Sequence, residues 1–412
     1  MRIIHTSDWH LGHTLHGLPR EYEHACFLDW LLAAIHEHAV DALLITGDVF
    51  ETHNPAATAQ AIWYRFLATA KQRYPDLDIL VVGGNHDSAE RLNAPVPILN
   101  AFGIHVVGGL ARLPDDRLDL DRLVVPLYRQ GEVAAWVAAV PFLRPADLRG
   151  IDDARHDALE QGVWQVYEEV IAAARGRCRP GQALIATGHC YMQGTTLSEL
   201  SERKILGGNQ HALPADIFPD DLAYIALGHL HRAQAVGRAH MRYSGSPIPL
   251  SMTELAYVHQ VVLVELAGAG AAMTALPVPR AVAITRVPED WPRTLPEVVR
   301  LLKTLPARHE GGRDELRPMI EVCVALDGPQ PHLKRDIEQA LDGKEARLAK
   351  ITVTWPERGQ EALLAPGTPL VDLVPEDVFR ARYRRDFQRD PPPPLVAAFH
   401  ELVEAVHVGR GQ

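Results

Sequence analysis

Five short apolar runs in this chain end in the same way, in small residues followed by Asp, Asn or His. Each run has the length and the aliphatic, β-branched composition of a buried strand. The runs are Arg2–Thr6, Ala42–Thr46, Ile79–Val82, Ala183–Thr187 and Leu222–Leu227. This repeated ending constrains the fold more than any other feature, because five buried strands must end beside polar side chains.

Segments with helical spacing of apolar residues lie between these runs. They are Glu21–His38, Pro55–Tyr74 and Ala158–Arg175. Strands that alternate with helices predict βαβ units and a largely parallel α/β core. Ligands of such sheets bind beyond the carboxyl ends of the strands. The polar residues expected there are Asp8, His10, Asp48, Asn85, His86, His189, His229 and His231.

The last run ends in Gly-His-Leu-His, and in extended backbone His229 and His231 would lie side by side on one face. For this motif alone, a polar turn is an equally good interpretation. Core histidines or solvated carboxylates could also explain any one of the other residues. Five coincidences of the same kind favour a shared metal site over scattered structural polar residues.

The donor types at these strand ends are carboxylate, amide and imidazole. Without cysteine, such a set suits divalent cations such as Mn²⁺, Fe²⁺ or Zn²⁺. Even if one of the eight residues is not a ligand, seven ligands are too many for one ion. They suit two ions about 4 Å apart that share one carboxylate, as in two-metal phosphoryl-transfer sites. A separate acid is then needed for the leaving alkoxide.

The composition is that of a globular protein of two or three domains, with 412 residues of which 47% are hydrophobic. The formal net charge of −11 does not indicate a broad basic surface for nucleic acid, but it is compatible with carboxylates that hold cations. We expect no secretory signal and no membrane span. The four cysteines have no CxxC spacing, so reduced thiols in a cytoplasmic protein are expected.

The five strand endings, read as DWH, GD, GNHD, GH and GHLH, resemble the motifs of the calcineurin-like metallophosphoesterases, in the same order. The resemblance implies a four-layer α/β/β/α sandwich that binds two divalent cations, with Mn²⁺ expected. It places Asp8, His10 and His231 on one cation and Asn85, His189 and His229 on the other, with Asp48 as the bridge. It also makes His86 the proton donor to the leaving group and Asp87 the residue that orients it.

Longer stretches, DWHLG, GDVFETHNP and GGNHDSAERL, resemble the SbcD-like nuclease subunits within that family. The resemblance implies a DNA phosphodiesterase in an ATP-dependent complex that acts as a double-strand exonuclease and a single-strand and hairpin endonuclease in DNA end processing, recombination and repair. The implied partners are an SbcC-like ATPase with a coiled coil, DNA ends and hairpins, and a second copy of the chain in a heterotetramer. The roles of Glu51 and His13 stay open.

The chain is expected to divide into three parts. Residues 1–275 form the metallophosphoesterase domain, and residues 276–357 read as a small α/β unit that the resemblance makes a capping, DNA-guiding domain. Residues 370–412 contain two amphipathic helices, Pro375–Arg389 and Leu395–His407, separated by a proline run. These helices are interpreted either as a hairpin packed on its own domain or as a docking site for the ATPase.

Two other functions fit parts of the sequence. The same metals would serve a nucleotidase, a cyclic-nucleotide phosphodiesterase or a protein phosphatase, although the long extension after the first domain favours a nuclease. A scaffold that kept the fold and lost the chemistry is the other alternative. The presence of all seven expected ligands and of His86 argues against it.

Overall fold

The computed structural model describes residues 1–148, 156–196, 212–268, 270–355, 375–396 and 398–399. The chain forms two compact units, Met1–Ala283 and Ile284–Gln412. The expected boundary after residue 275 differs from this division. It would cut strand β14 (Gly270–Pro277), which pairs along its whole length with β13.

The first unit contains two six-stranded sheets. The first sheet has the order β14-β13-β1-β4-β5-β6, in which β1, β4, β5 and β6 are parallel and β13 and β14 are antiparallel additions. The bounds are β1 Arg2–Thr6, β4 Ala42–Thr46, β5 Asp78–Val82, β6 Ile104–Val107 and β13 Gln260–Ala267. The strands predicted at 2–6, 42–46 and 79–82 are therefore confirmed.

The second sheet has the order β11-β12-β10-β9-β8-β7, with β8, β9, β10 and β12 parallel. The bounds are β7 Val124–Arg129, β8 Glu132–Ala139, β9 Ala183–His189, β10 Tyr224–Gly228, β11 Gln234–Val236 and β12 Arg238–Tyr243. The parallel centre agrees with the prediction. The hairpins β7–β8 and β11–β12 do not carry the repeated ending, and the sequence did not predict them.

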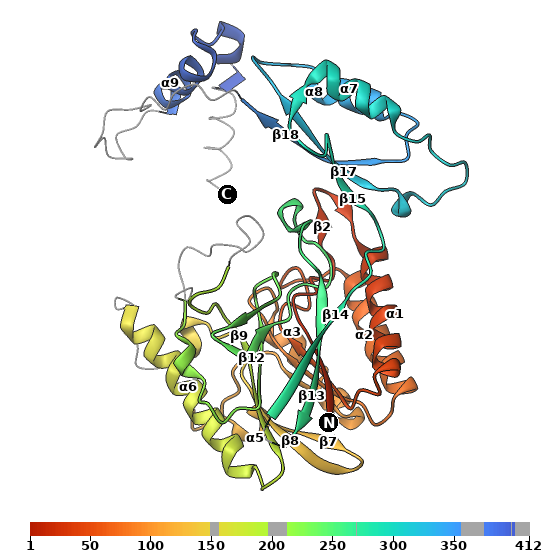
Figure 1. Ribbon diagram of the computed structural model, residues 1–412. Helices are drawn as coiled ribbons and strands as arrows, with labels where there is room; N and C mark the ends of the chain where they lie inside the picture. The colour runs from red at the N-terminus through yellow and green to blue at the C-terminus, as the bar shows by residue number, and fades with distance from the viewer. Residues whose placement is uncertain (149–155, 197–211, 269, 356–374, 397, 400–412) are drawn as a thin grey trace. The chain divides into compact units, whose positions relative to one another are not determined.

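The two sheets pack face to face, with helices outside each of them (Figure 1). Alternate residues of β4 belong to different cores: Leu43 and Ile45 pack with helices α1 and α2, whereas Ala42 and Leu44 pack with the second sheet. Helix α6 covers β7, β8 and β9. The helix bounds are α1 Glu21–Glu37, α2 Ala57–Arg73 and α6 His156–Arg177. This is the expected four-layer α/β/β/α sandwich.

Shorter elements connect these layers. The short helices are α3 Ala89–Asn93, α4 Val96–Leu99 and α5 Leu120–Leu123, and a small hairpin joins β2 Thr14–Leu15 to β3 Leu18–Pro19. Single 3₁₀ turns span Asn100–Phe102, Pro145–Asp147, Ala215–Ile217, Met252–Glu254 and, in the second unit, Asp314–Leu316. Within the described residues, no helix is long and apolar enough to cross a membrane.

The second unit begins with a small α/β fold. Its strands are β15 Ile284–Val287, β16 Arg293–Thr294, β17 Met319–Ala325 and β18 Arg347–Thr354, all parallel to β17, and its helices are α7 Leu295–Thr304 and α8 Leu333–Leu341. Alternate residues of β17, such as Ile320 and Val322, share a core with Val298 and Ile337 of the two helices. These strands and helices lie within residues 276–357, the range in which the sequence indicates a small α/β unit.

The chain continues into helix α9 (Pro375–Phe387), within the predicted Pro375–Arg389. Its aromatic side chains pack inside the unit: Phe387 lies edge-on to Trp355, with ring centroids 5.4 Å apart, and Phe379 stacks on Phe399 at 4.3 Å. Tyr383 is buried between them. Most of the second predicted helix, Leu395–His407, lies outside the described residues, since these end at residue 399.

Candidate metal centre

The candidate ligands converge where the carboxyl ends of β1, β4 and β5 face those of β9 and β10. Asp8 and His10 follow β1, Asp48 follows β4, Asn85 follows β5, His189 ends β9, and His229 and His231 follow β10. All seven side chains are buried, with at most 9% of each residue exposed. Burying this many polar groups is costly unless they are paired or bind an ion, so their convergence indicates a site.

The backbone at this edge adopts conformations that L-residues rarely use. Asp8, His10, Asp48 and His229 all have positive φ, between 48° and 105°. Such strain is retained where the surrounding structure enforces it, which is common at functional sites. The extended geometry expected for His229 is therefore wrong. Its ring lies 5.3 Å from that of His189, whereas the ring of His231 lies 5.2 Å from that of His10.

Two glycines make this close approach possible. A Cβ atom on Gly47, which has φ of 95°, would lie 2.1 Å from the His189 ring. A Cβ atom on Gly84 would lie 2.1 Å from the Asp48 carboxylate. Any side chain at these two positions would displace a candidate ligand, so glycine is required there.

The first group of donors is Asp8, His10 and His231, whose ligand atoms all lie within 4.8 Å of one another. The Nε2 atom of His10 is buried and, among the described residues, has no hydrogen-bond partner. Its distance to Oδ2 of Asp48 is 3.6 Å. A buried ring nitrogen without a hydrogen bond is the arrangement expected of an atom that binds a cation.

The second group is Asn85, His189 and His229. The side-chain oxygen of Asn85 lies 3.0 Å from Nε2 of His189 and 3.1 Å from Nδ1 of His229. Nε2 of His189 is also 3.4 Å from Oδ2 of Asp48. One carboxylate oxygen thus lies between the two groups, which is the position a bridging ligand would need.

The far sides of three histidine rings are held by acceptors. Nδ1 of His10 pairs with the Glu51 carboxylate and Nδ1 of His231 with the Glu254 carboxylate, each at 2.9 Å. Nδ1 of His189 donates to the Thr46 carbonyl at 2.8 Å. Because Nδ1 of each ring is engaged in this way, Nε2 is the nitrogen that would bind a cation. The sequence did not predict the roles of Glu254 and Thr46, because neither lies after a strand in the repeated pattern.

The charges of these groups depend on one another. Burial raises the pKa of Asp48, but the neighbouring His189 and His10 outweigh it and hold that pKa well below its usual range. Burial lowers the pKa of His189, yet Asp48 raises it to about 9. Burial lowers the pKa of His229 to about 3. His229 is therefore neutral and able to ligate, whereas a cation at His189 must displace a proton.

His86 lies beside this centre, with its ring 4.7 Å from that of His10. Its backbone N–H donates to Asp48 at 2.8 Å, and its Nδ1 pairs with the Glu51 carbonyl at 2.7 Å. The expectation that Asp87 orients His86 is not met. The Asp87 carboxylate accepts the backbone N–H groups of Val49, Phe50 and Gly84 instead, so it holds the two turns together.

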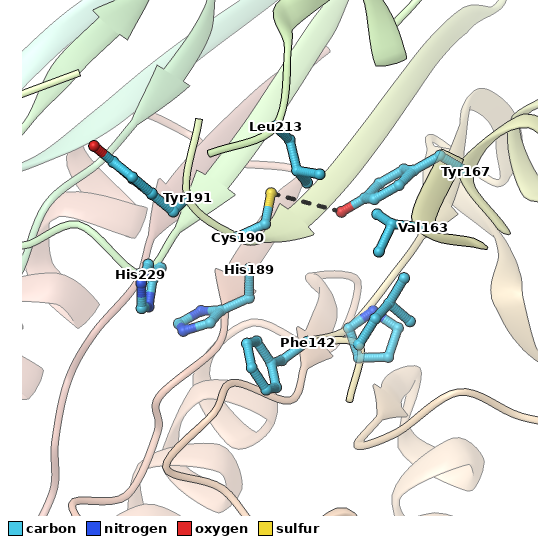
Figure 2. Close-up of a pocket in the computed structure, with 10 residues that line it drawn as sticks. Phe142, Val163, Tyr167, His189, Cys190, Tyr191, Leu213 and His229 are labelled. Atoms are coloured by element: carbon cyan, nitrogen blue, oxygen red, sulfur yellow. Dashed lines mark hydrogen bonds between the residues drawn. The ribbon is translucent and has the colours of Figure 1, made fainter. Parts of the chain in front are cut away.

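A small apolar pocket adjoins His189 and His229 (Figure 2). It has about 20 Å³ of room for water, enough for a single molecule. Cys190 points away from His189 toward Tyr167, whose hydroxyl donates to Sγ at 3.9 Å. Cys190 is thus no ligand of the candidate centre, and all four cysteines are free thiols.

Comparison with known proteins identifies the family. Residues 1–233 match the model of calcineurin-like phosphoesterases, and residues 281–387 match that of the type 5 capsule protein repressor C-terminal domain. The chain is 41% identical to the SbcD subunit of the SbcCD nuclease from Rhodobacter capsulatus over 387 residues, which cover 93% of this chain and 94% of that protein. The chain belongs to the SbcD family of calcineurin-like phosphoesterases.

More distant members agree over a shorter length. The SbcD subunit of the Escherichia coli K12 nuclease is 39% identical over 273 residues, or 63% of this chain and 64% of that protein. The corresponding SbcD subunit of Bacillus subtilis is 35% identical over 273 residues, or 64% of this chain and 66% of that protein. This family implies bound divalent metal, and the donor set fits it. Carboxylate, amide and imidazole donors lie in two neighbouring groups, and Nε2 of His10 is buried without a hydrogen bond among the described residues.

Proposed function

We propose that this chain is a metal-dependent DNA nuclease that hydrolyses phosphodiester bonds with two divalent cations. Membership of the SbcD family supports the nuclease activity. The two-cation assignment is based on the position of Asp48. Its Oδ2 atom lies 3.6 Å from Nε2 of His10 and 3.4 Å from Nε2 of His189. The first cation would bind Asp8, His10 and His231, the second would bind Asn85, His189 and His229, and Asp48 would bind both.

When bound, two such cations supply an activated water and neutralise the charge that develops on the phosphate. The protein's own residues supply the rest. His86 would give a proton to the leaving alkoxide from Nε2, because its Nδ1 already donates to the Glu51 carbonyl. This role requires the doubly protonated imidazolium. Burial lowers the pKa of His86, whereas the Asp48 carboxylate and the Glu51 carbonyl favour the protonated ring. Asp87 would hold the turn that carries Asp48 against the turn that carries His86, because its carboxylate accepts three backbone hydrogen bonds from these turns.

We further propose Mn²⁺ as the physiological cation. Oxygen and imidazole donors without thiolate suit Mn²⁺, and they also suit Fe²⁺ and Zn²⁺. Elemental analysis of protein purified without added metal, followed by reconstitution with each ion in turn, tests this choice.

The proposed partners are an SbcC-like ATPase with a coiled coil, DNA ends and hairpins, and a second copy of the chain. Exposed apolar side chains support the second copy: Tyr64 on α2, Ile98 on α4 and Phe102 in the turn after it are 38%, 67% and 57% exposed. Helix α9 and the segment after it are the proposed docking site for the ATPase. Cytoplasmic localisation belongs to the same proposal.

Two assays test the function. The first compares cleavage of duplex DNA with blocked ends by the chain alone and by the chain with its ATPase partner. We expect cleavage that depends on the divalent cation and, for blocked ends, on the partner. The second measures hydrolysis of bis-nitrophenyl phosphate. Hydrolysis of this ester without any DNA cleavage would instead indicate a phosphatase or a nucleotidase, and inactivity in both assays with metal bound would indicate a scaffold.

A further inference from the structure

The two halves of the candidate centre differ in what supports their histidines. In the half formed by Asp8, His10 and His231, both imidazoles pair with carboxylates, Glu51 and Glu254. In the other half, His189 is held by the neutral carbonyl of Thr46, and Nδ1 of His229 faces the Asn85 amide. The first half therefore has two more negative charges immediately behind its ligands.

Glu51 is placed to fix the orientation of His10. Its carboxylate lies 2.9 Å from Nδ1 of His10, whose side chain is only 3% exposed. The backbone of Glu51 is fixed as well, because its N–H donates to the Leu11 carbonyl at 3.1 Å and its carbonyl accepts from His86.

A carboxylate behind a metal-binding imidazole has two physical effects. It holds the ring in one orientation and one tautomer, and it increases the basicity of the opposite nitrogen. Loss of such a partner typically weakens metal binding about 10- to 100-fold. A neutral carbonyl orients the ring but adds less negative charge.

We propose that Glu51 is a positioning residue which, together with Glu254, makes the half formed by Asp8, His10 and His231 the tighter of the two cation sites. This inference rests on the proposed two-cation centre. It assigns an order of filling: the carboxylate-supported half fills first, and the half formed by Asn85, His189 and His229 fills second.

Titration of the metal-free full chain with Mn²⁺, with free Mn²⁺ measured by electron paramagnetic resonance, tests the proposal. The wild type should bind in two phases. Glu51→Gln keeps the size of a side chain that is 27% exposed but removes its charge, and it should weaken the tighter phase about 10- to 100-fold without changing the weaker phase. Glu265→Gln, a control at an exposed pair with Arg2, should leave both phases unchanged.

A second variant assigns the phases. Asn85→Ala should remove the weaker phase and leave a tight phase that is still sensitive to Glu51→Gln. If Glu51 only positions His10, excess Mn²⁺ should restore the hydrolysis of bis-nitrophenyl phosphate by Glu51→Gln. A general structural defect would not be reversed by added Mn²⁺. One shared phase in the wild type, or equal weakening of both phases, would overturn the proposal. The binding readout needs no DNA, so two-phase binding without DNA cleavage would overturn only the proposed function.

Discussion

At the scale of single residues, Asp48 connects the two groups of candidate ligands. One carboxylate oxygen faces His10 and His189, and the other accepts the backbone N–H of His86. Since two cations that lie close together repel each other, a shared carboxylate stabilises both of them.

We therefore expect Asp48→Ala to lose most of both cations, whereas a variant of a terminal ligand would lose mainly one. Elemental analysis of purified protein measures this directly. Asp221→Ala is a suitable control, because Asp221 forms an exposed ion pair with Arg175, and it should keep full metal content. Two equivalents of metal in Asp48→Ala would rule out the bridging role.

His86 offers a second residue-scale prediction. His86→Gln should keep both cations and still bind DNA, because the Gln side chain can donate to the Glu51 carbonyl as Nδ1 does. Cleavage of DNA should fall about 10²- to 10⁴-fold, the usual contribution of a general acid. Hydrolysis of an ester with a nitrophenolate leaving group should fall far less, because that group needs little protonation. Equal losses on both substrates, with metal bound, would show that His86 is not the acid.

At the scale of the elements, one buried histidine links the two sheets beneath the centre. His5 of β1 pairs through Nδ1 with the hydroxyl of Tyr224 on β10 at 2.8 Å, and through Nε2 with the hydroxyl of Thr46 on β4 at 2.9 Å. Burial lowers the pKa of His5 to about 3, from an ordinary value of 6.5. The folded protein therefore keeps this ring neutral at a pH where the unfolded chain binds a proton.

This difference predicts how stability depends on pH. Between pH 6.5 and 3 the unfolded chain binds the additional proton, so the free energy of unfolding should decrease as the pH falls through this window, by about 1.4 kcal/mol per pH unit for this group. When the pH falls from about 7.5 to about 5, the free energy of unfolding of His5→Gln should decrease by about 2 kcal/mol less than that of the wild type. Denaturant titrations at the two pH values measure this difference. His36→Gln, at an exposed position, should behave like the wild type. An unchanged pH dependence in His5→Gln would contradict the burial of a neutral ring.

At the scale of the whole molecule, the candidate ligands and the proposed docking segment for the ATPase belong to different units. All candidate ligands lie within Met1–Ala283, whereas α9 belongs to the second unit. The aromatic side chains of α9 pack on Trp355 and Phe399, which supports the interpretation that this part of the tail packs on its own unit. The ATPase would therefore have to contact other faces of the tail.

Deletion of residues 375–412 should leave metal content and bis-nitrophenyl phosphate hydrolysis nearly unchanged, because all seven candidate ligands lie within Met1–Ala283. Binding to the ATPase partner should be lost, since the amphipathic segments that would dock are removed. Co-purification of the two proteins from co-expressing cells measures this. Co-purification of the truncated chain at the level of the full chain would exclude the tail as the docking site.

The sequence by itself determined the strands that lead into the centre and the eight polar residues at their ends, because strand composition and strand endings are local properties of the chain. Only the tertiary structure decided how these residues group. The positive φ of His229 turns its ring to His189, and the carboxylate expected to orient His86 instead binds three backbone N–H groups. Glu254, the acceptor behind His231, comes 23 residues later in the chain and follows no strand. Such pairings depend on which turns meet when two sheets pack together, and a local pattern carries no information about that.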